Sequence, residues 1–326
     1  MTQSFEPTSM PKTRRLTASP DAIAEAADVL RHGGLVAFPT ETVYGLGADA
    51  NCGEAVARIY AAKDRPTFNP LIAHVADLAA ARREGGFSGT ALRLAEAFWP
   101  GPLTLVVPLA KGASVSELAR AGLDSVALRV PGHPLARTLI AAVGRPIAAP
   151  SANRSGRVSP TTADHVLADL DGRIDLVLDG GATMVGVEST IVACLGTPPV
   201  LLRPGGVARE AIERLVGPLA GVGGTDRPLA PGLLASHYAP HAALRLGATE
   251  VREGEAALDF GGRLAGGVLR LDLSPSGDLV EAAANLFAFL RRLDATGAAA
   301  IAVAPIPAEG LGEAIRDRLE RAAAPR

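Results

Sequence analysis

The chain has 326 residues, a formal net charge of −2, a pI of about 6.3 and 48% hydrophobic residues. This length allows two domains, each with its own core. The near-neutral charge argues against a large basic surface for nucleic acid, although it leaves room for a local anion pocket. Residues 1–20 have no apolar segment typical of a secretory signal, and no apolar run approaches the length of a membrane span. Cys52 and Cys194 suggest neither a disulfide framework nor a zinc site. We therefore expect a soluble, cytoplasmic protein without a membrane segment.

Apolar periodicity predicts alternating helices and strands over residues 19–216, preceded by a flexible tail at 1–18. Ser19-Pro-Asp21 is typical of a helix start, and Gly33-Gly34 is expected to end that helix. The other helices are expected at 54–62, 91–98, 135–143, 162–170 and 209–216. Strands are expected at 35–38, 71–75, 103–108, 126–130, 146–149 and 176–178, with further apolar runs at 190–195 and 200–202. This pattern predicts a mixed α/β domain with a twisted sheet.

Residues 217–240 are rich in Gly and Pro, which is typical of a linker. After it, apolar runs at 244–246, 268–273 and 298–306, with helices at 279–293 and 311–323, predict a small α/β domain at 241–326. His237 and His241 have the i, i+4 spacing of a helical metal pair. Because Pro240 lies between them in a Pro-rich segment, they are only a weak indication of a metal site.

Polar segments follow many of the expected strands, and in an α/β protein such strand ends form pockets. The first is Pro39-Thr-Glu-Thr-Val-Tyr-Gly-Leu-Gly47, and one helix later come Lys63 and Arg65. Lys63 is unusual because the 32 basic residues include few Lys. The remaining segments are 69–74, 125–129, 148–153, 159–161, 187–190 and 202–206.

Basic and hydroxyl side chains in these segments suit a highly charged anion such as a triphosphate. The cations that could converge are Lys63, Arg65, Arg129 and Arg203, and the neutral donors are Thr42, Ser151, Asn153, Ser159 and Ser189. The sequence has no P-loop, no complete dinucleotide fingerprint and no Gly-x-Ser-x-Gly elbow. It therefore predicts an anion site assembled from dispersed segments.

These segments, in order from about Ala18 to Gly206, resemble the threonylcarbamoyl-AMP synthase family, the YrdC-type fold, in its long two-domain form. Matching motifs include Pro39–Gly47, Ala-Lys63-Asp-Arg65-Pro, Trp99-Pro-Gly-Pro-Leu-Thr, Ala-Pro-Ser151-Ala-Asn153, Gly-Val-Glu188-Ser-Thr and Leu-Arg203-Pro-Gly. His237-Tyr-Ala-Pro240 resembles the motif that joins the two domains of the family. The resemblance implies a YrdC-like twisted open mixed sheet flanked by helices, plus a smaller Rossmann-like α/β C-terminal domain.

The resemblance also implies a nucleotidyltransferase that condenses L-threonine, bicarbonate and ATP to threonylcarbamoyl-AMP and pyrophosphate. Mg²⁺ would accompany ATP, and no organic cofactor is expected. The product would pass to a tRNA threonylcarbamoyltransferase that modifies adenosine 37, and the linker would act as a lid.

Three groups of site residues follow from the same resemblance. L-Threonine would be bound by Thr42, His74, Arg129, Ala149 and Ser189. ATP would be bound by Arg65, Asn69, Ser125, Ser151, Ser159, Arg203 and Tyr238. Lys63, Arg65 and Asn153 would be catalytic, stabilising phosphate or carbamate charge.

Simpler interpretations stay open for several of these residues. Arg65 and Arg129 could be ordinary salt-bridge residues, His74 and Tyr44 could be core residues, and Ser159 could only begin a turn. Glu41 and Glu188 could bind Mg²⁺ or orient their neighbours. An RNA-binding YrdC-like module is an alternative function. A carbamoyl-adenylate enzyme of hydrogenase maturation is another, but it requires zinc-finger segments that the sequence lacks.

Overall fold

The computed structural model describes residues 12–67, 69–87, 89–221 and 237–325. The elements of the larger part are β1 (Arg14–Thr17), α1 (Pro20–Arg31), β2 (Val36–Pro39), β3 (Tyr44–Asp49), α2 (Gly53–Lys63), β4 (Ile72–His74), α3 (Leu78–Glu84), α4 (Gly89–Phe98), β5 (Leu103–Pro108), β6 (Ser125–Arg129), α5 (Pro134–Val143), β7 (Ile147–Ala148), α6 (Ala163–Leu170), β8 (Leu176–Asp179), β9 (Thr190–Ala193), β10 (Val200–Arg203) and α7 (Arg209–Val216). Those of the smaller part are β11 (Ala243–Arg245), β12 (Glu255–Asp259), β13 (Arg270–Asp272), α8 (Leu279–Asp294), β14 (Ala300–Val303) and α9 (Leu311–Ala323).

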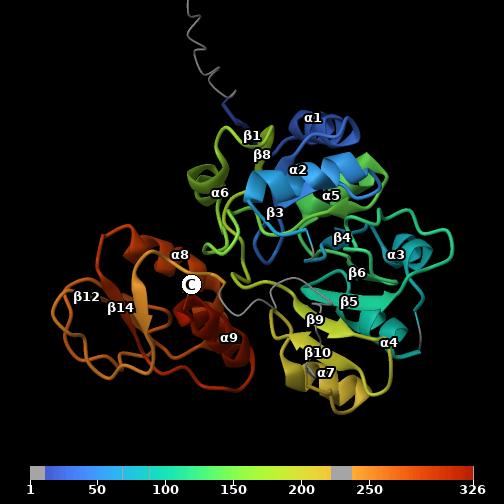
Figure 1. Cartoon of the computed structure of the whole chain (residues 1–326). Helices are drawn as coiled ribbons and strands as arrows, with labels where there is room; N and C mark the ends of the chain where they lie inside the picture. Colours follow the sequence, from blue (N-terminus) through green and yellow to red (C-terminus); the bar gives the residue numbers. More distant parts are fainter. Residues whose placement is uncertain (1–11, 68, 88, 222–236, 326) are drawn as a thin grey trace, which may run out of the picture.

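The larger part is built on a mixed ten-stranded sheet in the order β1-β8-β2-β3-β7-β4-β6-β5-β9-β10. The smaller part has a parallel four-stranded sheet in the order β11-β14-β12-β13, with α8 and α9 beside it (Figure 1). This arrangement confirms the predicted fold class. The helix expected at Ser19-Pro-Asp21 begins there, because the Ser19 side chain accepts a hydrogen bond from the backbone N–H of Ala22.

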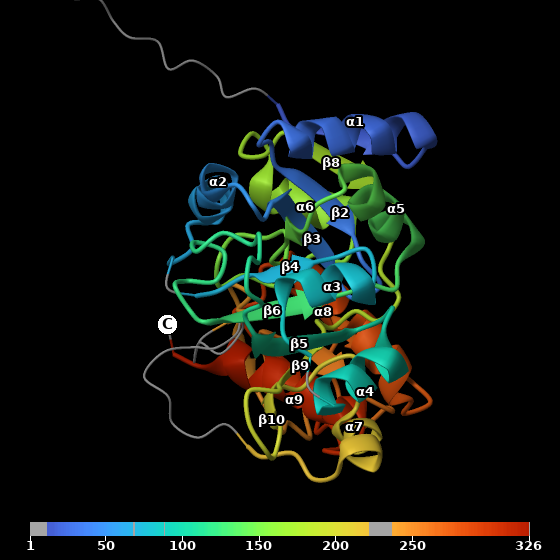
Figure 2. The ribbon, with the colours of Figure 1, turned by 90° about the vertical axis from the view of Figure 1, so that its right-hand side faces the viewer.

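Alternating residues of β2 pack into two different cores, as the two faces of a strand require. Val36 and Phe38 pack with residues of α1 and α5, whereas Ala37 packs with residues of α2. Helices therefore cover both faces of the sheet, which Figure 2 shows from the side. Because both faces are buried, the polar groups that remain accessible in this region collect at the strand ends.

The largest error of the sequence analysis in the sheet concerns residues 44–49. Residues 44–49 were expected to belong to a polar segment after β2 and not to a strand, but Tyr44–Asp49 form β3, which pairs antiparallel with β2. Gly47 permits this pairing, since a Cβ there would lie 2.7 Å from the ring of Phe38. Glycine and polar residues give a weak strand signal, so periodicity missed β3. The helix α3 and the strand β12 were missed as well.

The flexible tail predicted for residues 1–18 is wrong in its last part. Residues 14–17 form β1, which pairs in parallel with β8 at the edge of the sheet. Thr13 is buried, and its hydroxyl donates a hydrogen bond to the carbonyl of Ile174 at 2.9 Å. Residues 1–11 and the part of the predicted linker at 222–236 lie outside the described residues.

The two sheets belong to parts that are packed against each other. The apolar core of the smaller part includes Val43, Val158 and Val187 of the larger part. Gly186 has φ 75°, and a Cβ there would lie 2.3 Å from the carbonyl oxygen of Ala283 in α8, so only glycine suits this close approach. The C-terminal domain is therefore fixed against the segment that leads into β9.

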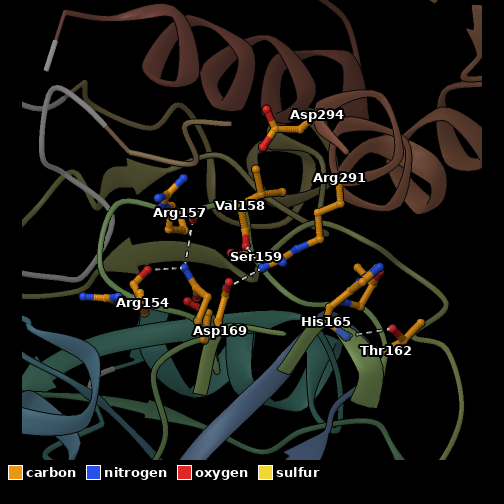
Figure 3. A network of polar contacts seen from close by, with 12 residues as sticks. Arg154, Arg157, Val158, Ser159, Thr162, His165, Asp169, Arg291 and Asp294 are labelled. Carbon is orange, nitrogen blue, oxygen red and sulfur yellow. Dashed lines mark hydrogen bonds and ion pairs between the residues drawn. The ribbon is translucent and has the colours of Figure 1, made fainter. Parts of the chain in front are cut away.

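A polar contact reinforces this interface (Figure 3). Arg291 of α8 forms an ion pair with Asp169 of α6 at 2.7 Å and donates a hydrogen bond to the carbonyl of Val158. Among the described helices, none combines the length and the apolar character that a bilayer crossing needs.

Candidate functional site

One pocket collects the side chains of strand ends that are far apart in the sequence. The segments 40–45, 149–151 and 188–189 contribute to its wall, together with the ends of β4, β6 and β10 and with His237 and Tyr238 near the end of the linker. All predicted threonine-binding residues line it, namely Thr42, His74, Arg129, Ala149 and Ser189. Of the predicted ATP-binding residues, Arg65, Ser151, Arg203 and Tyr238 line it too.

Arg129 and His74 lie side by side because β4 and β6 pair in parallel with these two residues in register. Arg129 forms an ion pair with Glu41, with Nη2 2.7 Å from Oε1, and both side chains are buried. Burial alone would raise the pKa of Glu41, but the charge of Arg129 and its hydrogen bond lower it. Arg129 is thus both a salt-bridge residue and a pocket residue, and Glu41 orients it.

Neutral groups surround this ion pair. Burial, together with the nearby charge of Arg129, lowers the pKa of His74 to about 3, so its imidazole is neutral at physiological pH. The Thr42 hydroxyl lies 2.8 Å from that of Thr40. This end of the pocket therefore offers one compensated ion pair and several neutral hydrogen-bonding groups.

Arg65 and Arg203 give another end of the pocket a different character. The Arg203 guanidinium donates to the carbonyl of Ser189, at 3.2 Å from Nε and 2.9 Å from Nη2. Arg65 Nη2 contacts the carbonyls of Asn69 and Pro70 at 3.4 and 3.3 Å, and its buried Nε has no partner among the described residues. Burial lowers the pKa of Arg65 to about 10, so the group stays cationic at neutral pH. These positive charges are suited to an anionic ligand.

Lys63 does not line the pocket, and its expected role in stabilising phosphate or carbamate charge stays a prediction. Its side chain is buried, and Nζ donates to the carbonyls of Ser151, at 2.6 Å, and of Asn153. Burial and the nearby charge of Arg65 lower the pKa of Lys63. In this structure Lys63 holds the 151–153 loop, which in turn forms part of the pocket wall.

Asn153 also supports its own loop instead of lining the pocket. Its Nδ2 donates to the carbonyls of Arg154 and Arg157, both at 2.8 Å, while Oδ1 has no partner among the described residues. Asn69 and Ser125 lie outside the lining as well, although both are buried. The proposed direct contacts of these residues with ATP therefore stay predictions.

Glu188 connects the pocket to the C-terminal domain. It lines the pocket and accepts hydrogen bonds from the Ser159 hydroxyl at 2.5 Å and from Nε of Arg318, in α9, at 2.8 Å. Ser159 itself does not line the pocket. Arg318 was not predicted as a site residue. A signal exists, because Ile315, Arg318 and Leu319 fall on one helical face, where a charged residue among apolar ones is unusual.

Tyr238 and Tyr44 have different roles. Tyr238 is buried with φ 63°, lines the pocket and stacks on Phe287 of α8 at 5.5 Å between ring centroids. The core interpretation of Tyr44 is confirmed, because its ring is buried in the main core and its hydroxyl donates to the carbonyl of Gly181 at 2.7 Å.

The described residues contain no group of three or more His, Cys, Asp or Glu side chains that could hold a metal ion. His237 and His241, the pair that gave a weak indication of a metal site, lie in different surroundings. His237 is buried against the ring of Tyr238, whereas exposed His241 lies 2.9 Å from the Asp294 carboxylate.

Comparisons with known proteins agree with this geometry. The family model described as "Telomere recombination", which covers Sua5, YciO and YrdC proteins, matches residues 28–205. The model described as "Threonylcarbamoyl-AMP synthase, C-terminal domain" matches residues 207–324. The two matches follow each other and include every strand of both sheets except β1.

Full-length relatives carry the same assignment. A threonylcarbamoyl-AMP synthase of Bacillus subtilis is 44% identical over 331 residues, covering 95% of each chain. One of Pyrococcus abyssi is 44% identical over 321 residues, covering 91% of this chain and 92% of the relative. The crystal structure of P. abyssi Sua5 complexed with L-threonine matches with a TM-score of 0.87 at 39% identity, covering 95% of this chain and 97% of that one. The chain therefore belongs to the threonylcarbamoyl-AMP synthase family, in the form that carries the C-terminal domain.

Proposed function

We propose that this chain condenses L-threonine, bicarbonate and ATP to threonylcarbamoyl-AMP and pyrophosphate. The observation that carries the proposal is a single pocket with two unlike ends. One has neutral His74 and Arg129, whose charge is compensated by the buried Glu41 outside the lining, and the other has Arg65 and Arg203. An amino acid carries both signs of charge, whereas a triphosphate carries only negative charge. The names of the full-length relatives and the threonine complex of the P. abyssi protein support the same assignment.

The reaction joins two anions. The threonine amine adds to bicarbonate with loss of water and gives a carbamate, and a carbamate oxygen then attacks the α-phosphorus of ATP. The bond from that phosphorus to the bridging oxygen breaks, and pyrophosphate leaves. Repulsion between the carbamate and the phosphates must be overcome. Arg65 and Arg203 would do this by neutralising phosphate charge, while the pocket aligns the reactants.

We expect Mg²⁺ to arrive at the site bound to ATP. Glu41 and Glu188 are already engaged by Arg129 and by Ser159 and Arg318, and the described residues offer no metal cluster. A Mg²⁺ ion would therefore be held mainly by ATP phosphate oxygens, which it would help to neutralise.

The linker would close the site. His237 and Tyr238, near the end of the linker, already form part of the pocket wall. Excluding water there would protect the labile adenylate until a partner transferase moves the threonylcarbamoyl group to adenosine 37 of tRNA. The linker residues 222–236 lie outside the described residues, so the closure rests on these two flanking side chains.

Pyrophosphate release by the full chain tests the proposed function. We expect release only when ATP, L-threonine and bicarbonate are all present, with the product detected by its mass. Equal release without threonine would contradict the proposal. Strong, salt-sensitive tRNA binding without any turnover would favour the RNA-binding alternative.

A further inference from the structure

Arg318 is a fully buried cation in the C-terminal domain that forms an ion pair with Glu188 of the larger domain. Its side chain is 0% exposed, and its Nε lies 2.8 Å from Oε2 of Glu188. Its Nη1 is bound by the neighbouring Asp317. Removing two charges from water is costly, and a buried ion pair is often no more stabilising than apolar residues of similar size. The presence of this pair is therefore poorly explained by stability alone.

Through Glu188, Arg318 reaches the wall of the pocket. Glu188 lines the pocket and uses its other oxygen to accept the hydrogen bond from Ser159. The order of contacts is thus Arg318, Glu188 and then the Ser159 hydroxyl. Without Arg318, the buried carboxylate would lose its closest cation and the orientation that this cation imposes.

A second contact of Arg318 leads to the same pocket. Its Cζ lies 5.2 Å from the centroid of the Tyr238 ring, which is within the range of a cation–π interaction. Phe287 stacks on Tyr238 from α8. Two helices of the C-terminal domain therefore support Tyr238, which holds a strained positive φ beside the pocket.

We infer that Arg318 is a positioning residue of the site, which orients Glu188, Ser159 and Tyr238 for the nucleotide. The identity of that nucleotide as ATP rests on the proposed function. On this account the C-terminal domain is a structural part of the ATP end of the pocket. Arg318 makes no recorded contact with the residues predicted to bind threonine, so it acts on only one of the two substrates.

The chain supplies a matched control in the same helix. Glu313 of α9 forms an ion pair with Arg209 of α7 and so also joins the two domains. Both side chains are about one-third exposed, and neither lines the pocket. Glu313→Gln therefore disturbs the interface without touching the site, and an exposed pair of this kind contributes little.

The test is isothermal titration calorimetry of the full-length chain. Mg²⁺–ATP is titrated in one experiment and L-threonine in another. For Arg318→Met we expect ATP affinity to fall by at least about tenfold, the usual loss for a hydrogen bond to a charged group. Threonine affinity should stay within about twofold of wild type, and Glu313→Gln should change neither affinity by more than about twofold. Arg318→Lys keeps the charge and should lie between Arg318→Met and wild type. Melting temperatures of all variants show whether each is folded.

Unchanged ATP affinity in Arg318→Met would overturn the inference, and so would equal losses for both ligands, because that pattern indicates general damage to the interface. If Arg318→Met does not fold, Glu188→Gln/Arg318→Met replaces it, since this variant removes both buried charges. Wild-type ATP affinity in that double variant would also overturn the inference. If the wild type binds ATP but shows no threonine-dependent turnover, the proposed reaction fails while the affinity comparison still decides the role of Arg318.

Discussion

The two ends of the pocket differ in how the charges of their arginines are compensated. At the amino-acid end, the charge of Arg129 is compensated by Glu41, and His74 is kept neutral by burial. At the phosphate end, the recorded partners of Arg65 are backbone carbonyls, which orient the guanidinium without cancelling its charge. The difference teaches that the number of basic residues is a poor guide to a phosphate site. A cation is available for phosphate when its charge is not already compensated by a carboxylate.

The largest effect should come from breaking the compensated pair. Arg129→Met leaves the Glu41 carboxylate buried without its cation, and we expect the free energy of unfolding to fall by about 3–5 kcal/mol. Urea denaturation measures this loss. The double variant Glu41→Gln/Arg129→Met should recover most of the stability but not threonine binding. Recovery of both would show that the pair is only structural.

At the phosphate end, Arg65→Ala should leave the fold intact but lower kcat/KM for ATP by on the order of 10²–10³-fold, the usual effect of removing one preorganised charged donor. Steady-state pyrophosphate release measures it. Because Arg65 has no carboxylate partner among the described residues, its loss leaves no buried charge behind, and the melting temperature should change little. A large loss of stability would place Arg65 with Arg129 instead.

Lys63 distinguishes a supporting role from a catalytic one. Lys63→Met keeps the length of the side chain but removes the donor for the carbonyls of Ser151 and Asn153. We expect a loss of about 1–3 kcal/mol in unfolding free energy together with reduced activity, because the 151–153 loop loses its anchor. Full stability with abolished activity would instead indicate direct catalysis by Lys63, as the sequence analysis predicted.

The smallest effect concerns pH. The pKa of His74 is lowered to about 3 in the folded chain, so between about pH 6.5 and pH 3 the unfolded state binds a proton that the folded state does not. Stability contributed by neutral His74 is therefore complete above pH 6.5 and is lost as pH falls. Over pH 4–6, His74→Gln should reduce the slope of unfolding free energy against pH by at most about 1.4 kcal/mol per unit. An unchanged slope would contradict the neutral, buried imidazole.

Much of the site could be predicted from the sequence, because polar segments after strands converge in any α/β fold. Three of the four proposed cations, Arg65, Arg129 and Arg203, do line one pocket. Lys63 lies outside that lining, and its rarity in the composition carries no information on where Nζ points. Glu41 and Glu188 were left undecided because their partners lie far away in the chain.

The remaining misses have a common physical origin. The strand β3 depends on antiparallel pairing with β2, and Arg318 depends on the packing of α9 against the larger domain. The long-range partners of β3 and of Arg318 cannot be read from the local sequence, although a charge among apolar residues on one face of α9 is a local sign that Arg318 is buried. Elements stabilised by their own sequence, such as α1 with its Ser19 cap and α9, were predicted at nearly their observed bounds.

A crystal structure with L-threonine and a non-hydrolysable ATP analogue tests the two-ended pocket most directly. We expect the threonine carboxylate or amine beside Arg129, and the phosphates beside Arg65 and Arg203. Phosphates bound at the Glu41–Arg129 pair, or a nucleotide bound outside this pocket, would contradict it.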